Sequence, residues 1–224
     1  MISTTVFKSE EALLFQALEL LRGTLPLAGN LMLSGGSTPY ALYNRLATAP
    51  CPVHPERYLF LSDERMVPKE SEKNNAHNLM PMLRALGCEE RFIRVDTELP
   101  AAEAAARFAT DLQPLKKVDL GSLGMGADGH TAGIFSLEQA GQKTEALTQH
   151  TPRPDGMVGV STTPAFFQRV ERLVLIVTGA SKRAAIEALL HNPQSIPAGI
   201  ALANHPKVEL WTTASTVETS FQQG

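Results

Sequence analysis

The chain has 224 residues, of which 43% are hydrophobic and 19% are charged, and its formal net charge is −3 at pH 7. This length and composition are typical of a globular protein, and no Pro-, Gly- or Ser-rich linker divides the chain, so we expect one domain spanning 1–224. The 20 lysines and arginines are scattered along the sequence. They form no basic stripe, so nucleic acid is not an expected partner.

The sequence contains no apolar run close to the ~20 residues that a membrane-spanning helix needs, so no membrane partner is expected. Residues 1–8 lack the basic region and long apolar core of a signal peptide, which predicts a cytoplasmic protein. Cys51 and Cys88 match neither a disulfide framework nor a zinc motif. The histidines show no paired ligand spacing, so no metal is expected.

The apolar pattern predicts strands and helices in alternation along the chain. Strand-length apolar runs occupy 31–33, 58–61, 92–95, 117–123, 158–161, 173–177 and 208–211. Helical spacing occupies 10–25, 40–46, 79–86, 101–112 and 184–190. Residues 131–135 are a candidate helix start, and the polar residues 139–154 are expected to form an exposed loop rather than a lid. This order predicts an α/β fold, with a Rossmann-like, three-layer, mostly parallel sheet and right-handed crossovers.

Four of the predicted strands are followed by small or charged residues, at 34–38, 63–65, 124–130 and 178–182. Because ligands gather outside the carboxyl ends of parallel strands, we expect these four segments to meet along one edge of the sheet. Arg65 and Lys182 would bring positive charge to this edge, although Arg65 could instead close a structural ion pair. The convergence indicates a site for a small phosphorylated anion that undergoes acid-base chemistry.

Two of these segments suggest an anion site at the start of a helix. Thr38 is the expected N-cap and Pro39 the expected first helical residue, so the free N–H groups of the first turn would face the loop. Such a turn binds anions readily. Gly179 and Ser181 precede the last predicted helix in the same way, with Ser181 as its expected cap and Lys182 beside it.

The loop 124–130 contains three glycines together with Asp128 and His130. His130 supplies a group that accepts a proton near neutral pH. The loop also matches the dinucleotide pattern G-x-G-x-x-G, but the acidic residue expected ~20 positions further on would fall in the polar residues 143–145. A nucleotide cofactor is therefore not expected. No G-x-S-x-G motif supports Ser37 as a nucleophile.

The four segments resemble those of the 6-phosphogluconolactonases, within the glucosamine-6-phosphate isomerase/6-phosphogluconolactonase family, in order and spacing over nearly the whole chain. The matching motifs are Ser34-Gly35-Gly36-Ser37-Thr38-Pro39, Asp63-Glu64-Arg65-Met66-Val67-Pro68, Leu123 to Ala132, and Thr178-Gly179-Ala180-Ser181-Lys182. Gly129-His130-Thr131-Ala132 is closer to the lactonases than to the related glucosamine-6-phosphate deaminases, which usually carry isoleucine after the histidine.

This resemblance implies a fold of the sugar-phosphate isomerase type and hydrolysis of 6-phospho-D-glucono-1,5-lactone to 6-phosphogluconate in the oxidative pentose phosphate pathway, without a cofactor. It implies His130 as general base, oriented by Asp128, and the N–H of Gly126 as a donor to the oxyanion. The residues that it implies for substrate binding are Gly35, Gly36, Ser37, Thr38, Asp63, Arg65, Gly126 and Lys182. We expect a monomer or weak homodimer.

The sequence departs from the lactonase pattern at three places. Asn74-Asn75 stands where the family usually has Ser-Asn, and Gly133-Ile134-Phe135-Ser136 lacks the usual Leu-Phe-Pro. The arginine that usually opens an Arg-x-Thr-x-Thr strand is absent from 157–163, and Arg153 in the adjacent loop is a candidate replacement. Two alternatives therefore remain open: a glucosamine-6-phosphate deaminase or isomerase, and a non-catalytic sugar-phosphate sensor.

Overall fold

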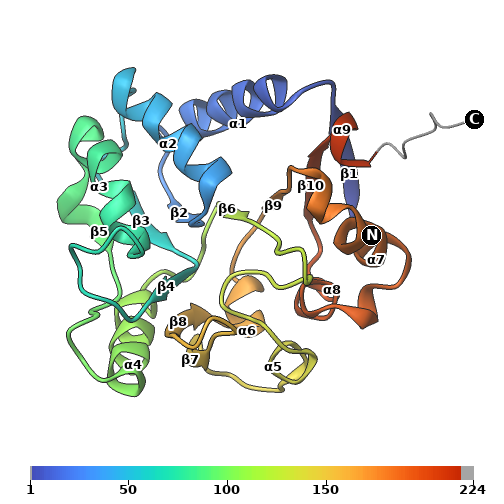
Figure 1. The fold of residues 1–224 in the computed structure, drawn as a ribbon. Coiled ribbons are helices and arrows are strands. Elements are labelled where there is room, and N and C mark those ends of the chain that lie inside the picture. The colour runs from blue at the N-terminus through green and yellow to red at the C-terminus, as the bar shows by residue number, and fades with distance from the viewer. Residues whose placement is uncertain (1, 218–224) are drawn as a thin grey trace, which may run out of the picture.

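A seven-stranded parallel sheet forms the centre of the computed structural model, which describes residues 2–217 (Figure 1). The strand order is β1-β10-β9-β6-β2-β3-β5. The strands are β1 (Ser3–Phe7), β2 (Asn30–Leu33), β3 (Tyr58–Leu61), β5 (Phe92–Ile93), β6 (Leu120–Leu123), β9 (Leu173–Ile176) and β10 (Val208–Thr213). The predicted α/β fold with a mostly parallel sheet is confirmed.

Helices cover both faces of the sheet and make the three layers that the sequence predicts. One face packs against α1 (Glu10–Thr24), α2 (Ser37–Thr48) and α3 (Asn75–Leu86). The other face packs against α4 (Ala101–Leu112), α6 (Pro164–Phe167), α7 (Arg183–His191) and α8 (Pro197–Leu202). The shorter elements α5 (Leu137–Gly141) and α9 (Ala214–Val217) and three 3-10 turns, η1 (Glu89–Arg91), η2 (Ala180–Lys182) and η3 (Pro193–Ser195), complete the chain.

Strand side chains alternate between two apolar cores because neighbouring residues of a strand point to opposite faces. On β2, Leu31 and Leu33 belong to the core under α1–α3, whereas Met32 belongs to the core on the other face. On β9, Val174 and Leu175 divide in the same way. The central strands are therefore buried on both faces, which explains why they are continuous apolar runs.

A second, three-stranded antiparallel sheet was not expected from the sequence. It consists of β4 (Asp63–Arg65), β8 (Val158–Thr162) and β7 (Thr148–Pro152), in that order. The prediction of a loop at 63–65 is wrong, and so is that of an exposed loop over all of 139–154. The polar residues 148–152 form β7, with Thr151 fully buried, because backbone hydrogen bonds to β8 hold the strand.

Three local predictions also need correction. The helix at 37–48 is capped by Gly36 and not by Thr38, because Gly36 has a φ of +121° and turns the chain earlier. Ser181 does not cap α7, whose N-cap is Lys182 without a side-chain hydrogen bond. Residues 131–135 form a turn, and α5 starts later, after the capping box of Ser136 and Gln139.

Cys51 and Cys88 are free, and Ser9 caps α1 as expected. Within residues 2–217, no helix is long and apolar enough to cross a membrane.

Candidate functional site

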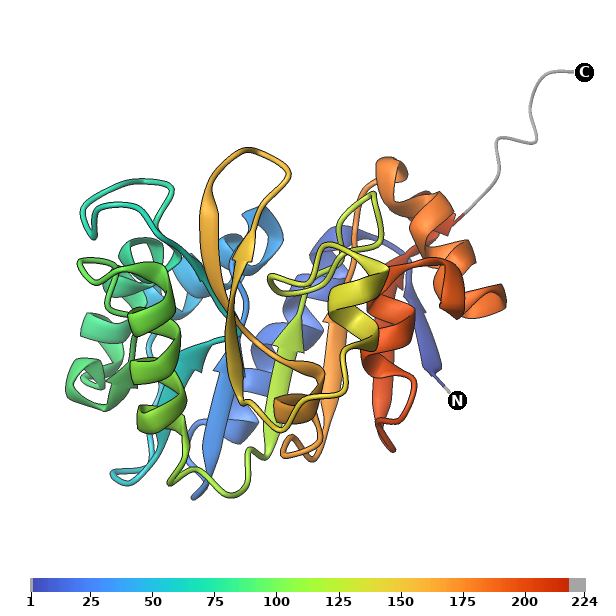
Figure 2. The ribbon, with the colours of Figure 1, turned by 90° about the horizontal axis from the view of Figure 1, so that it is seen from below.

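The four segments singled out in the sequence follow β2, β3, β6 and β9, which are adjacent in the parallel sheet. The chain leaves β2 toward β3 on one side and later returns through β6 on the other side, so the strand order reverses between β2 and β6. Open α/β sheets bind ligands at this kind of switch point. The carboxyl ends of these strands lie on the side toward which the turn between β7 and β8 projects (Figure 2).

A cavity of about 230 Å³ lies at this edge of the sheet. Nine of the ten residues predicted for the site line it: Gly35, Gly36, Ser37, Thr38, Asp63, Arg65, Gly126, His130 and Lys182. Asp128 does not line the cavity but is hydrogen-bonded to His130. Among the lining residues that the sequence did not name as site residues, Ser34, Asn75 and Thr178 carry polar side chains, and Arg153 enters from the β7–β8 hairpin.

The start of α2 presents backbone N–H groups to this cavity. Tyr40 is the first residue of the helix whose N–H donates within it, to the carbonyl of Gly36, so the N–H groups of Ser37 and Thr38 remain for a ligand. The hydroxyl groups of Thr38 and Thr178 are 3.0 Å apart, which ties the start of α2 to the end of β9. Lys182 reaches the same cavity from η2.

Asn75 fixes the position of Arg65. The Nη1 of Arg65 donates to the carbonyl of Lys73 at 2.8 Å and to the Oδ1 of Asn75 at 3.4 Å. The same Oδ1 accepts a hydrogen bond of 2.6 Å from the Tyr40 hydroxyl. Gly35 makes this packing possible, because a Cβ at position 35 would lie 2.5 Å from the Asn75 amide.

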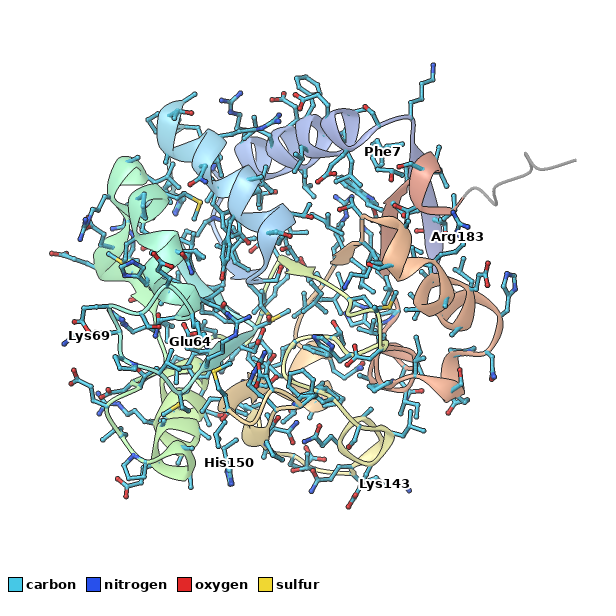
Figure 3. All side chains as sticks on the ribbon, viewed as in Figure 1. Phe7, Glu64, Lys69, Lys143, His150 and Arg183 are labelled. Carbon is cyan, nitrogen blue, oxygen red and sulfur yellow. The ribbon has the colours of Figure 1, made fainter. Side chains whose placement is uncertain are left out.

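Glu64 anchors β4 to the start of α3 and lies inside the molecule between them (Figure 3). Its carboxylate accepts hydrogen bonds from three backbone N–H groups, those of Arg65, Asn75 and Ala76, at 2.7 to 2.8 Å. These bonds set the spacing between Arg65 and Asn75. Burial raises the pKa of Glu64 to about 7, although the three N–H donors oppose this shift.

The raised pKa of Glu64 predicts a pH-dependent stability. Between its ordinary value of 4.5 and about 7, folded Glu64 holds a proton that the unfolded chain has released. This contribution is complete below pH 4.5 and is lost as the pH rises through about 7. Relative to Glu64→Gln, the wild-type free energy of unfolding should therefore fall by about 1 to 3 kcal/mol between about pH 5 and pH 8.

Urea unfolding of both proteins across this pH range measures the difference. Glu103→Gln, at an exposed position of α4, serves as the control and should follow the wild type at every pH. Parallel curves for wild type and Glu64→Gln would contradict the assignment.

His130 and Asp128 form a hydrogen-bonded pair in the loop after β6. The Nδ1 of His130 lies 2.5 Å from the Oδ1 of Asp128. Partial burial disfavours ionised Asp128, but the hydrogen bonds and charge of His130 outweigh it, so the pKa of Asp128 lies below its usual range. Because a carboxylate only accepts hydrogen bonds, Nδ1 carries the proton, and Nε2 of neutral His130 keeps its lone pair.

Gly126 makes room for this pair. Its N–H donates to the carbonyl of His130 at 2.8 Å, so in this structure it is already engaged within the loop and is not free for the implied donation to an oxyanion. A Cβ at position 126 would overlap both the His130 ring and the Asp128 carboxylate. The glycine is therefore required by the close approach of these two side chains.

Phe135 lies between His130 and Arg153. Its ring centroid is 4.6 Å from that of His130, and the Cζ of Arg153 lies 4.9 Å from the centroid of the Phe135 ring. The site therefore combines a histidine–carboxylate pair with three cations, Arg65, Arg153 and Lys182, at one cavity. Within residues 2–217, no group of three or more His, Cys, Asp or Glu side chains could hold a metal ion.

Several known proteins with similar sequences are named 6-phosphogluconolactonases. The 6-phosphogluconolactonase of Thermotoga maritima is 38% identical over 130 residues, which are 57% of this chain and 58% of that protein. The 6-phosphogluconolactonase of Rhizobium meliloti is 34% identical over 172 residues, 72% of each chain. The crystal structure of the Thermotoga maritima enzyme superposes with a TM-score of 0.79 at 25% identity, covering 95% of this chain and 99% of that one.

A family model described as glucosamine-6-phosphate isomerases/6-phosphogluconolactonase matches residues 21–211. This match includes all four segments that form the cavity. The chain therefore belongs to the glucosamine-6-phosphate isomerase/6-phosphogluconolactonase family.

Proposed function

We propose that this protein is a 6-phosphogluconolactonase, which hydrolyses 6-phospho-D-glucono-1,5-lactone to 6-phosphogluconate in the oxidative pentose phosphate pathway. The names of the relatives support this activity. The observation that carries the proposal is the His130–Asp128 pair, which leaves Nε2 as a proton acceptor at a cavity that Arg65 and Lys182 make cationic.

His130 is the general base of the proposed reaction. Its Nε2 takes a proton from a water molecule as the water oxygen attacks the lactone carbonyl carbon. The bond between this carbon and the ring oxygen then breaks, and the ring oxygen receives the proton from the imidazolium. Asp128 orients the ring and stabilises its positive charge between these two steps.

The other proposed site residues bind the substrate. Arg65, Lys182 and the N–H groups at the start of α2, with Gly36, Ser37 and Thr38, hold the phosphate. The Nε of Arg65 supports this role, because it is buried and has no hydrogen-bond partner within the described residues. Asp63, at the cavity wall, accepts hydrogen bonds from sugar hydroxyls, and Gly35 allows the close packing of Asn75.

The direct test measures acid release from freshly prepared 6-phosphogluconolactone above the spontaneous rate. We expect turnover of the lactone and no ammonia release from glucosamine 6-phosphate. Ammonia release without lactone turnover would favour a deaminase. Thermal stabilisation by 6-phosphogluconate without any turnover would favour a sugar-phosphate sensor.

Activity should decrease at acidic pH because protonated His130 cannot accept a proton. Asp128 stays ionised there, since its pKa is already below its usual range. Asp128→Asn keeps an acceptor for Nδ1–H but removes the negative charge that stabilises the imidazolium. We expect a kcat about tenfold lower and an acid limb shifted to lower pH. Rate profiles between about pH 5 and 8 test this, and an unmoved acid limb would contradict it.

A further inference from the structure

Arg153 reaches the cavity from the β7–β8 hairpin, which contains none of the four segments that follow the parallel strands. It follows directly after β7, and its N–H donates to the carbonyl of Met157 across the hairpin at 2.9 Å. Its side chain is only 10% exposed, although the turn that follows it is exposed. A long charged side chain at the end of a hairpin would ordinarily extend into water. Arg153 instead turns inward.

The inward path of Arg153 passes beside Gly159. In the second sheet, Gly159 lies opposite Thr151 of β7 and opposite Arg65 of β4. A Cβ at position 159 would lie 2.9 Å from the carbonyl oxygen of Glu64 and 3.4 Å from the Cδ of Arg153, so the arginine stem crosses β8 next to the glycine. The stem therefore runs from β7 toward β4, where Asp63 and Arg65 face the cavity.

Three groups hold the guanidinium at the cavity wall. It lies over the Phe135 ring, and its Nε and Nη2 are each 3.3 Å from Asp155. The carboxylate of Asp63 is 4.0 Å from Nη1, at the limit of an ion pair. Asp155 binds the Nε–Nη2 edge of the guanidinium. Nη1 therefore remains on the side of Asp63, which lines the cavity together with Arg153.

The charges around the cavity favour a strongly anionic ligand. Arg65, Arg153 and Lys182 line it, while Asp63 is the one carboxylate among the lining residues. Asp63 and Asp155 offset part of this positive charge, and an anionic ligand would offset the rest. In the proposed substrate, the phosphate is the group with fixed negative charge, and arginine binds phosphate through two parallel hydrogen bonds.

We infer that Arg153 is a substrate-binding residue, which the β7–β8 hairpin supplies to the phosphate from the side opposite α2. This inference rests on the proposed function. Phe135 and Asp155 orient the guanidinium before the substrate arrives. The Asp63 carboxylate faces Nη1 until the phosphate takes the place of this carboxylate. The same Phe135 ring contacts His130, so one aromatic side chain orients both the phosphate-binding arginine and the proposed base.

The test compares two substrates, 6-phosphogluconolactone and the unphosphorylated glucono-1,5-lactone. Arg153→Met should lower kcat/KM for the phosphorylated lactone by about 10- to 100-fold, the usual effect of losing a charged hydrogen-bonding partner. The rate with glucono-1,5-lactone, which has no phosphate to bind, should fall by a much smaller factor. Arg153→Lys, which keeps a charge but not the planar fork, should fall between wild type and Arg153→Met. Arg94→Met, at an exposed position after β5, is the matched control.

Inorganic phosphate gives a second readout that does not depend on turnover. It should inhibit or thermally stabilise the wild type at concentrations about tenfold lower than those needed for Arg153→Met. Equal losses on both lactones, or unchanged phosphate binding, would overturn the role of Arg153. A wild type without lactonase activity would instead overturn the proposed function, and the phosphate titration would still test Arg153.

Discussion

Replacement of His130 by alanine is expected to lower kcat for 6-phosphogluconolactone by about 10²- to 10⁴-fold, the usual contribution of a positioned general base. The variant removes the only side chain at the cavity that the proposed mechanism uses as a proton acceptor. KM should change much less, because Arg65 and Lys182 come from other segments of the chain. The measurement is acid release at neutral pH, corrected for spontaneous hydrolysis.

His150→Ala is the matched control, because this histidine is exposed on β7 and points outward from the molecule (Figure 3). It should retain wild-type kcat. Thermal unfolding of both variants separates chemistry from stability. His130 contacts Asp128 and Phe135 at the surface of the cavity, so its loss should leave the midpoint nearly unchanged. A His130→Ala protein with undiminished kcat would refute the proposed mechanism.

Most of the central sheet could be predicted because its inner strands are buried on both faces. Leu31-Met32-Leu33, 58–61 and 173–176 are continuous apolar runs, and each ends at a small or charged residue. Parallel order then places the following segments at one edge. This reasoning located the four segments that form the cavity, and the resemblance to the 6-phosphogluconolactonases named nine residues within them that line it. The helix at 101–112 was likewise predicted with its observed bounds, because its apolar side chains recur at helical spacing.

The second sheet could not be predicted because its strands lack this signal. Residues 148–152 are polar, and 63–65 are all charged. Their strand conformation depends on antiparallel hydrogen bonds to β8, between segments about a hundred residues apart in the case of β4. β1 was missed for a related reason, since its residues are mostly exposed and pair only with β10.

The missed site residues are placed by these long-range contacts. Nothing near Asn75 in the sequence indicates that its amide packs on Gly35, because hydrogen bonds with the distant residues Tyr40 and Glu64 hold it there. The sequence suggested Arg153 only as a loop residue that replaces the arginine missing from 157–163. Its side chain passes beside Gly159, a residue of another strand whose register the sequence does not reveal.

Gly126→Ala is expected to lower kcat by about 10²-fold, although residue 126 takes no part in the proposed chemistry. The added methyl group would overlap the His130 ring and the Asp128 carboxylate at once. Both are ends of side chains, so they can move apart and the loop can still fold. A displacement of about 1 Å at a reacting group is sufficient for a loss of this size.

The pattern of losses distinguishes displacement of the pair from general damage to the loop. KM should change little in Gly126→Ala, and Gly23→Ala, on α1 with no atom near the added Cβ, should behave like the wild type. If the methyl group acts through the His130–Asp128 pair, its effect should be smaller in an Asp128→Asn background, where the pair is already weakened. Additive losses would instead place the effect elsewhere in the loop. Glycine at position 126 would then be needed for the backbone conformation of the loop. The overlap instead predicts that it is needed for the distance between His130 and Asp128.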